Sequence, residues 1–276
     1  MKTIKQILLV AAAVALAISC NQEKSPKVLV LYYSQGGNTK AVAEEIQTRL
    51  GADIEAIVPV LSYDGDFQAT IERSRKEMDE GTWPEIQPVK SNIKSYDVIF
   101  LGYPIWFGTY APPIETLIGT IDLSGKKVVP FCTFGSGGLD SSIKALKEKL
   151  PDTEILPGYG VRAARVAAIP DEIDRFLKEG GFIEGEVTKP EEFPAPHEVS
   201  EEESAILATA IGDYPMMQNA MAKTVTSRSI TGGTEYLFTA ASAPRDDMPA
   251  PPGGGEFKVY VTALDGQPPV FTQVVR

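Results

Sequence analysis

The sequence predicts an α/β fold built on a doubly wound, five-stranded parallel sheet, followed by a smaller α+β domain. Over the first half of the 276 residues, short apolar runs alternate with segments of helical spacing. Near residue 185 the composition changes abruptly, and beyond it apolar and polar residues alternate with a period of two. Strand–helix alternation is typical of an open parallel sheet, and period-two alternation is typical of half-buried antiparallel strands.

The first predicted domain spans residues 27–184. Its first strand, Val28–Tyr33, is a continuous apolar run, as expected of a parallel strand buried on both faces. A helix should follow at Thr39–Leu50, where apolar residues recur every three or four positions. The remaining strand candidates are Ile54–Val60, 96–104, 126–134 and 152–160, and the remaining helical patterns are Ile114–Ile118, Ser141–Leu150 and Asp171–Glu179.

The second predicted domain spans residues 200–276 and is reached through a linker, residues 185–199, that is rich in proline and glutamate. A helix is predicted at Glu202–Met221. After it, Tyr236/Phe238 and Phe257/Val259/Val261 alternate as strand residues do. One helix followed by several strands predicts a helix packed on an antiparallel sheet.

The N-terminal segment reads as an export signal. The apolar run Ile7–Ile18 is shorter than the roughly 20 residues that span a bilayer, and it follows two lysines, as in a secretory signal. Leu-Ala-Ile-Ser-Cys resembles a bacterial lipobox, although Ala17 stands where leucine is commoner. We expect a signal peptide at residues 1–20, lipidation of Cys20, a tether at 21–26 and a bacterial membrane anchor. An ordinary signal peptide with an incidental cysteine is the alternative.

Composition excludes several kinds of site. The net charge is −11 and no basic cluster follows the first residues, so nucleic acid is not an expected partner. His197 is the only histidine, and Cys132 is the only thiol left if Cys20 is lipidated. These counts argue against a zinc site, a disulfide, and Cys–His or Ser–His catalysis. We therefore predict no metal and no catalytic side chain, with the chemistry supplied by a cofactor.

A glycine loop between the first strand and the first helix is suited to a phosphate. Ser34, Asn38 and Thr39 offer side-chain donors, and Gly36 and Gly37 allow close approach of the backbone. The N-terminus of the helix favours an anion through its dipole and its unpaired amides. No Walker loop, dinucleotide fingerprint or nucleophile elbow occurs at this place. Neutral donors of this kind suit a monophosphate ester held without a metal.

Three motifs carry a resemblance to a known family. Tyr-Tyr-Ser-Gln-Gly-Gly-Asn-Thr-Lys resembles the phosphate loop of flavodoxins, which wraps the phosphate of FMN. The segments 96–118 and 126–147 are similar to the second and third cofactor loops of that superfamily. More narrowly, they resemble a bacterial branch with the pattern Gly-Tyr-Pro-Ile-Trp-Trp-Gly, in which Phe107 replaces the second tryptophan. The resemblance covers about 155 residues and implies a flavodoxin-like fold with FMN as cofactor.

The resemblance also implies where the cofactor lies. In a doubly wound sheet a ligand sits beyond the carboxyl ends of the strands, where all three loops should open. Trp106 and Tyr110 would flank the flat flavin ring by stacking, unless both are merely core aromatics. The predicted cofactor-binding residues are Ser34, Gln35, Gly36, Gly37, Asn38, Thr39, Pro104, Ile105, Trp106, Phe107, Gly108, Tyr110, Thr133, Phe134, Gly135, Gly137 and Gly138.

The C-terminal segment resembles the cystatin-like fold. Ser-Arg-Ser-Ile-Thr-Gly-Gly-Thr-Glu-Tyr stands where cystatins place their first inhibitory hairpin, Gln-x-Val-x-Gly. The glutamine is missing, because Arg228 or Ser229 occupies its position. We carry over the fold and not the inhibition, and expect a module for docking or interaction.

These features lead to one preferred function and two alternatives. The preferred interpretation is a flavodoxin-like redox protein that transfers electrons through bound FMN to a quinone or a protein partner. A NAD(P)H-dependent quinone reductase is one alternative, although no motif for a second nucleotide is found. The other is a binding module that keeps the flavodoxin-like domain only as a scaffold.

Overall fold

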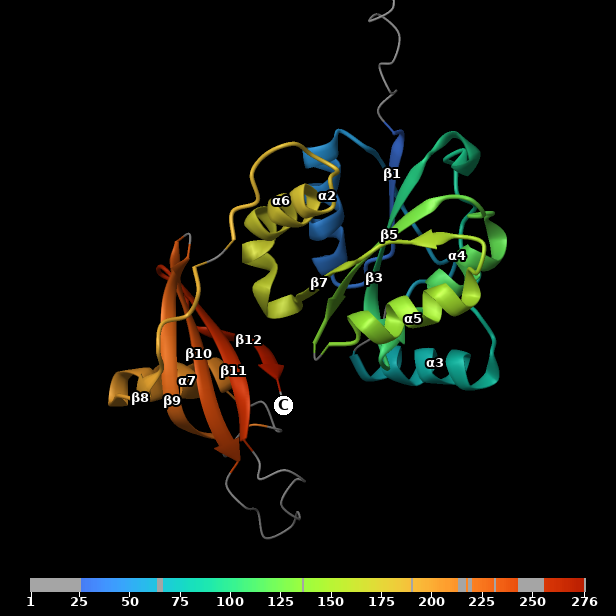
Figure 1. Ribbon diagram of the computed structural model, residues 1–276. Helices are drawn as coiled ribbons and strands as arrows, with labels where there is room; N and C mark the ends of the chain where they lie inside the picture. Colours follow the sequence, from blue (N-terminus) through green and yellow to red (C-terminus); the bar gives the residue numbers. More distant parts are fainter. Residues whose placement is uncertain are drawn as a thin grey trace, which may run out of the picture.

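The structure is a computed structural model in which two domains lie side by side (Figure 1). It describes residues 26–63, 67–135, 137–189, 191–212, 217, 220–230, 232–242 and 256–275. The predicted signal peptide with Cys20, and the tether up to residue 25, lie outside these residues. Within the described part of the chain, no helix is both long enough and apolar enough to cross a membrane.

The first domain contains the predicted parallel sheet. Its strands follow the order β2-β1-β3-β5-β6, with β7 also paired to β5, so the chain winds outward from β1 in both directions. This confirms the doubly wound, five-stranded arrangement, with β6 and β7 as two pieces of the fifth strand. The strands are β1 (Val28–Tyr32), β2 (Asp53–Ala56), β3 (Val98–Trp106), β5 (Lys127–Phe134), β6 (Glu154–Ile155) and β7 (Tyr159–Arg162).

The fifth strand is interrupted at Pro157 and Gly158. Proline has no backbone N–H to donate to the sheet, so pairing cannot run through it. Next to it, a Cβ on Gly158 would lie 2.8 Å from the Pro130 carbonyl oxygen. Glycine is therefore required where the chain passes close to β5.

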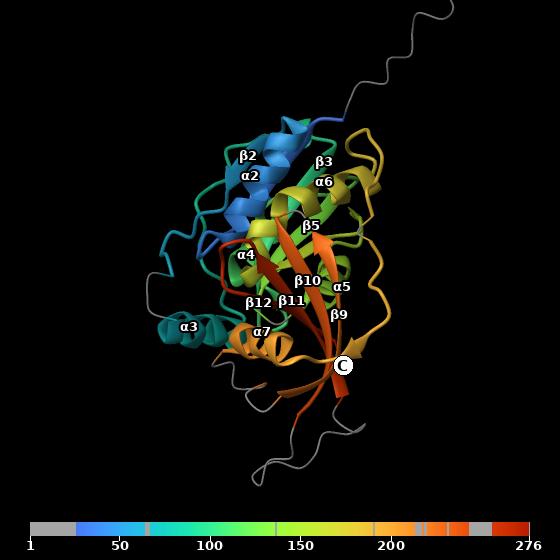
Figure 2. The same cartoon turned by 90° about the vertical axis from the view of Figure 1, so that its left-hand side faces the viewer.

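Helices cover both faces of the sheet, as alternating burial along the strands requires. Val30 and Phe100 point to one face and pack with α2 (Asn38–Leu50) and α6 (Ile169–Glu179). Figure 2 shows these two helices together on the near side of the sheet. Leu29 and Leu101 point to the other face, towards α4 (Pro112–Thr120) and α5 (Leu139–Lys149).

Four further elements of this domain were not predicted from the sequence. They are α3 (Phe67–Glu80), the short strand β4 (Thr109–Tyr110), η1 (Ile93–Ser95) and η2 (Ala163–Ala168).

The second domain is a helix on an antiparallel sheet, as predicted. Its strand order is β12-β11-β10-β9-β8. Leu207 and Ile211 of the helix pack on Val225, Phe238 and Val259 of the sheet. The resemblance to cystatins in particular remains a prediction. The elements are β8 (His197–Glu198), α7 (Glu201–Ile211), β9 (Ala220–Ile230), β10 (Gly233–Ser242), β11 (Glu256–Leu264) and β12 (Val270–Val275).

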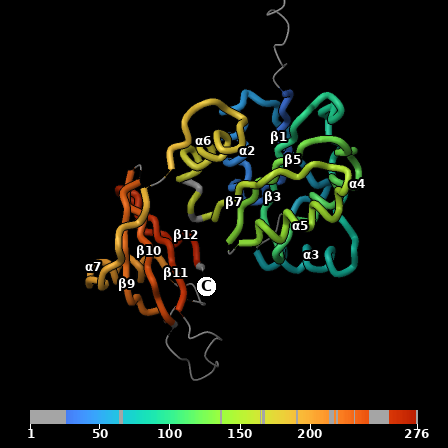
Figure 3. Tube along the Cα trace, viewed as in Figure 1, coloured from blue at the N-terminus to red at the C-terminus, as the bar shows by residue number. Residues whose placement is uncertain are grey.

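Two predicted boundaries in this region are wrong. The helix expected to reach Met221 ends at Ile211, where Gly212 caps it with a φ of 49°, and Met221 already belongs to β9. The predicted linker 185–199 also ends too late, because β8 within it pairs with β9. Figure 3 shows the Cα trace of both domains, with α6 in the first and α7 in the second.

Gly102 packs too closely on a neighbouring strand to carry a side chain, which yields a stability prediction. A Cβ at this position would lie 2.1 Å from the ring of Phe131 on the neighbouring strand. We expect Gly102→Ala to lower the free energy of unfolding by roughly 1–3 kcal/mol, because the core cannot absorb the added volume. Urea unfolding followed by circular dichroism measures this.

Gly119→Ala is the matched control. Gly119 lies in α4 with no atom within 4 Å of a would-be Cβ. Alanine there should leave stability unchanged or raise it by roughly 0.5–1 kcal/mol. Equal destabilisation by both substitutions would contradict the packing argument.

Candidate cofactor site

Three loops meet at the carboxyl edge of the parallel sheet because their strands are neighbours in register. Tyr32 of β1 pairs with Gly102 of β3, and Gly102 pairs with Phe131 of β5. The next residues along each strand lead directly into the predicted cofactor loops. The structure therefore brings residues 34–39, 104–108 and 133–138 to one edge, as expected.

The first loop leaves the N-terminus of α2 open to an anion. Gly37 precedes the helix with a φ of 90°, and no side chain caps the helix. The Ser34 hydroxyl oxygen instead accepts from the backbone N–H of Gly37 at 3.2 Å, which closes the loop. The first backbone N–H groups of a helix have no partner within it, so an uncapped N-terminus suits a phosphate.

Gly36 also supports a phosphate site at this loop, because neither its backbone conformation nor the packing of the described residues requires a glycine there. Its φ lies outside the left-handed region, and no atom of the described residues stands within 4 Å of a would-be Cβ. Gly135 in the third loop has the same two properties. A glycine without a conformational or packing role leaves space for something that approaches the backbone from outside. The loops thus fit a phosphate ester bound against main-chain amides.

Besides Ser34, two other predicted phosphate-loop side chains have partners within the protein. The hydroxyl of Thr39 is buried and lies 2.8 Å from the hydroxyl of Thr133, which ties the first loop to β5. The amide of Gln35 accepts from the Tyr33 hydroxyl at 2.6 Å and donates to the Tyr63 carbonyl at 2.6 Å. Gln35 therefore organises the loop through its side chain and offers a ligand mainly its backbone.

The second loop is a tight hairpin with an unusual tip. Trp106 pairs with Thr109, and the two residues between them, Phe107 and Gly108, have φ values of 51° and 82°. Two successive residues with positive φ are typical of a type I′ turn, which favours Asn-Gly. A phenylalanine in this conformation is strained. Its ring is nonetheless 43% exposed, and the Arg75 guanidinium lies 4.6 Å from the ring centroid.

Trp106 stands at the side of the site within a cluster of aromatic rings. Its indole meets Tyr33 edge-on at 5.8 Å and Tyr63 edge-on at 5.1 Å between centroids. Tyr63 is a residue that the sequence analysis did not select, and no local pattern marks it. It reaches the cluster from the segment after β2, so only the fold brings it there.

Tyr110 does not fit its predicted stacking role. Its side chain is 6% exposed, and its hydroxyl donates to the Glu115 carboxylate at 2.6 Å. Its ring packs edge-on against Tyr103 at 5.9 Å, and burial raises the pKa of the Tyr110 hydroxyl. A ring enclosed in this way offers no face to a ligand. Tyr110 is therefore an aromatic residue of the core, which was the alternative to stacking on the flavin. Phe107 is the accessible aromatic ring of this loop.

The third loop is packed against the second. A Cβ on Gly138 would lie 2.7 Å from Ile105 Cγ2, and Ser141 donates its hydroxyl to the Gly108 carbonyl. Gly137 and Gly138 have φ values of 117° and 113°, which side chains rarely adopt. These contacts hold the second and third loops as one unit. Thr133 is buried and Phe134 is half-buried, and Pro104 lies in β3 beside Thr133.

The cysteine next to the third loop is not suited to thiol chemistry. Cys132 is fully buried, and burial, with a smaller contribution from Asp140, raises the pKa of its thiol to about 12. A thiol with that pKa stays protonated at neutral pH and is a poor nucleophile. Among the described residues, no three His, Cys, Asp or Glu side chains form a group that could hold a metal.

The strain at Phe107 predicts that the site reduces stability. Asparagine adopts the left-handed conformation far more readily than phenylalanine. We therefore expect Phe107→Asn to raise the free energy of unfolding of the cofactor-free protein by about 1 kcal/mol. Phe107→Trp, which restores the Trp-Trp pattern of the bacterial branch but keeps a bulky ring, should give no gain. Thermal unfolding of the three proteins tests this, and a less stable asparagine variant would contradict it.

Several solved structures of flavoproteins are similar to part of this chain. A proposed flavoprotein of Bacteroides eggerthii is 35% identical to it, and the alignment covers 54% of this chain and 96% of that protein, with a TM-score of 0.48. A proposed flavoprotein of Bacteroides uniformis is 28% identical over 55% of this chain and 99% of its own, with a TM-score of 0.49. A flavoprotein of Lactobacillus acidophilus, solved in complex with FMN, is 26% identical over 49% and 93%, with a TM-score of 0.46.

Among curated proteins no sequence matches this chain. The sequence profile of the family described as Flavodoxin matches residues 27–171, which is more than half of the 276 residues. The match spans β1 to the start of α6 and so includes all three loops. The chain therefore belongs to the flavodoxin family.

Proposed function

We propose that this protein transfers electrons through FMN held by the three loops at the carboxyl edge of the sheet. The observation that carries the proposal is the pairing of two subsites on that edge. One is the uncapped N-terminus of α2 beside the open Gly36, and the other is the exposed aromatic tip at Phe107. FMN has a phosphate ester at one end and a flat ring at the other, and FMN is the cofactor of the flavodoxin family.

The phosphate end would be held without a dedicated cation. Lys40, the lysine nearest the loop in sequence, pairs with Glu44 of its own helix at 3.6 Å. Backbone amides of the first turn, with the hydroxyl of Ser34 and the amide of Asn38, supply the donors. The dipole of α2 adds to their effect at its N-terminus. This set of donors supports a monophosphate ester rather than a longer, more highly charged phosphate chain.

The ring end would lie against the second and third loops. When bound, FMN supplies the one- and two-electron chemistry, and the protein supplies position and environment. Phe107 offers a ring face, Trp106 closes one side, and the open backbone at Gly135 can approach the polar edge of the flavin. The residues proposed to contact FMN are Ser34, Gly36, Gly37, Asn38, Thr39, Trp106, Phe107, Gly108, Gly135 and Gly137.

Gly36→Ala gives a direct test of the phosphate subsite. The substitution meets no atom in the protein, so we expect the free energy of unfolding to stay the same or rise slightly. The added methyl group occupies space that a phosphate against the backbone needs, so FMN should bind at least about tenfold more weakly, a difference of about 1.4 kcal/mol. Quenching of flavin fluorescence measures the dissociation constant.

Gly119→Ala serves as the matched control, since it adds the same methyl group at another uncrowded glycine. It should bind FMN within about twofold of the parent protein. Unchanged FMN affinity in Gly36→Ala would contradict the assignment of this loop.

Electron transfer itself is tested with FMN-loaded protein lacking residues 1–20. The bound FMN should be reduced chemically under anaerobic conditions and should then return electrons to an added acceptor such as cytochrome c. Steady consumption of NADH or NADPH with a quinone would instead favour the quinone reductase. A protein that retains no FMN after desalting would contradict both functions and favour the binding module.

We further propose that the protein is exported and anchored to a bacterial membrane through lipid on Cys20. The support is the apolar run Ile7–Ile18 followed by a small residue directly before the cysteine. Growth with radiolabelled palmitate should label the parent protein, and Cys20→Ser should abolish the label. A labelled serine variant, or an unlabelled parent protein, would contradict lipidation.

A further inference from the structure

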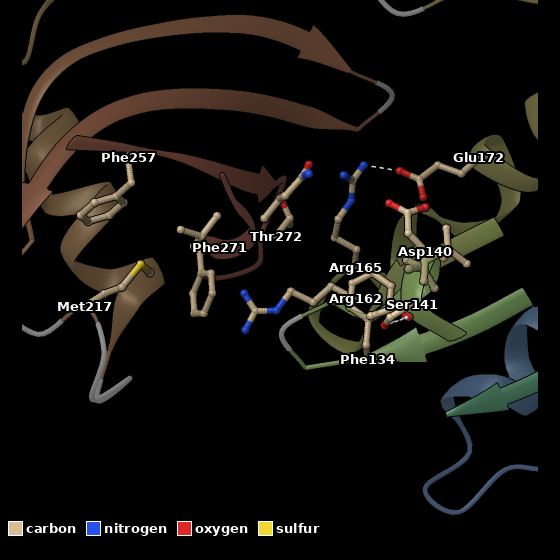
Figure 4. Close-up of a pocket in the computed structure, with 17 residues that line it drawn as sticks. Phe134, Asp140, Ser141, Arg162, Arg165, Glu172, Met217, Phe257, Phe271 and Thr272 are labelled. Atoms are coloured by element: carbon tan, nitrogen blue, oxygen red, sulfur yellow. Dashed lines mark hydrogen bonds and ion pairs between the residues drawn. The ribbon is translucent and has the colours of Figure 1, made fainter. Parts of the chain in front are cut away.

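A large pocket lies between the two domains and is separate from the phosphate loop. Its volume is about 920 Å³, which is ample for a small organic ligand. The first domain contributes the third cofactor loop and the end of β7, and the second domain contributes β11 and β12. Figure 4 shows the side chains of the two domains facing each other across this space.

Aromatic and aliphatic side chains form much of the lining. Phe134 comes from the end of β5, and Phe257 and Phe271 come from the sheet of the second domain. Val161 of β7 also lines the pocket. Phe257 and Phe271 are largely buried, so they form an apolar wall of the cavity rather than open stacking faces, and such a wall suits an apolar ligand.

The charged groups of the lining balance. Arg162 and Arg165 face Asp140 and Glu172, two positive and two negative charges. The guanidinium of Arg162 lies over the Phe271 ring, 3.7 Å from its centroid, and so links the two domains. Equal numbers of opposite charges do not favour an ionic ligand of either sign, which points to an uncharged one.

Arg165 has one polar atom that the protein leaves without a partner. Its terminal nitrogens pair with Glu172 in the first domain and, at 3.8 Å, with Glu235 in the second. Glu235 is itself buried and also accepts from Arg228 at 2.8 Å. The Nε–H of Arg165 is buried and has no hydrogen-bond partner among the residues that the structure describes. A buried donor of this kind is costly unless something supplies an acceptor.

The pocket also adjoins the proposed flavin. Phe134, Gly137 and Gly138 line it, and the same residues form the third cofactor loop. A ligand in the pocket would therefore lie next to the loop at the edge of the flavin ring.

We infer that the interdomain pocket binds a flat, uncharged aromatic compound with a carbonyl oxygen at its edge, of the quinone class. The carbonyl would accept from Arg165 Nε, and the ring would lie among the phenylalanines. The role of this compound as electron acceptor rests on the proposed function, whereas its binding does not. In that role reduced FMN, as FMNH2, would supply both the two electrons and the two protons that convert the quinone to the hydroquinone.

Equilibrium dialysis of 1,4-naphthoquinone against the FMN-loaded chain without residues 1–20 tests the inference. Naphthalene, which has the same ring system without oxygens, is the comparison ligand. We expect saturable binding of the naphthoquinone and at least tenfold weaker binding of naphthalene. Arg165→Lys keeps the positive charge beside Glu172 and Glu235 but removes the Nε–H, and should weaken naphthoquinone binding about tenfold.

Arg228→Lys is the matched control. Arg228 pairs with the same buried glutamate but does not line the pocket, so naphthoquinone binding should stay within twofold of the parent. Absence of saturable binding in the parent protein would overturn the inference. So would equal binding of the two ligands, or equal weakening by both lysine variants. The comparison of the two ligands on the parent protein decides the matter even if a variant does not fold.

The flavin spectrum of each sample separates this inference from the proposed function. Retained FMN without naphthoquinone binding overturns the pocket assignment and leaves FMN binding intact. Naphthoquinone binding without retained FMN supports the pocket as a binding site and contradicts the proposed electron transfer.

Discussion

The parallel pairing of β1, β3 and β5 is the constraint on which the rest of this protein depends. These central strands are covered by helices on both faces, so their side chains are buried whichever way they point. Loops can leave the sheet only at its ends, and in parallel strands all the carboxyl ends lie together. Residues separated by about 100 positions in the sequence, such as Thr39 and Thr133, thus come within hydrogen-bonding distance.

Within that frame, rigidity at the site comes from close contacts rather than from charge. Gly138 presses on Ile105, Ser141 bonds to the Gly108 carbonyl, and the two threonine hydroxyls join the first loop to β5. Phe107 is the exception, because it holds a strained conformation at an exposed tip. Strain of this kind at a site is maintained by the surrounding structure and is typical of residues kept for a ligand.

The sequence was most informative where neighbouring residues decide the structure. The apolar run of β1 and the glycine loop after it are local patterns, and both lie where they were expected. Tyr110 was misplaced because its burial depends on Tyr103 and Glu115, which a motif cannot show. Tyr63 and the whole of α3 were missed for related reasons. Only one α3 residue, Ser74, is buried, so this helix has little apolar pattern to detect.

The second domain shows the same limit in a different form. Its alternating strands were recognisable, yet nothing in the sequence indicated that β12 would lie beside η2 of the first domain. Pairing across domains depends on side chains such as Arg162, Arg165 and Glu235, whose partners lie far away in the chain. The interdomain pocket could therefore not be predicted from the sequence.

The position of Arg165 between two carboxylates affects how the two domains are held together. Its charge is shared between Glu172 of one domain and Glu235 of the other, so separating the domains would leave a buried carboxylate with fewer partners. A compound that satisfies the remaining N–H binds only when both walls are in place. By thermodynamic linkage, it then stabilises the closed arrangement by the same free energy with which closure favours its binding. The second domain would thereby couple ligand binding in the pocket to the contact between the two domains. Arg165 is the residue through which this coupling would act.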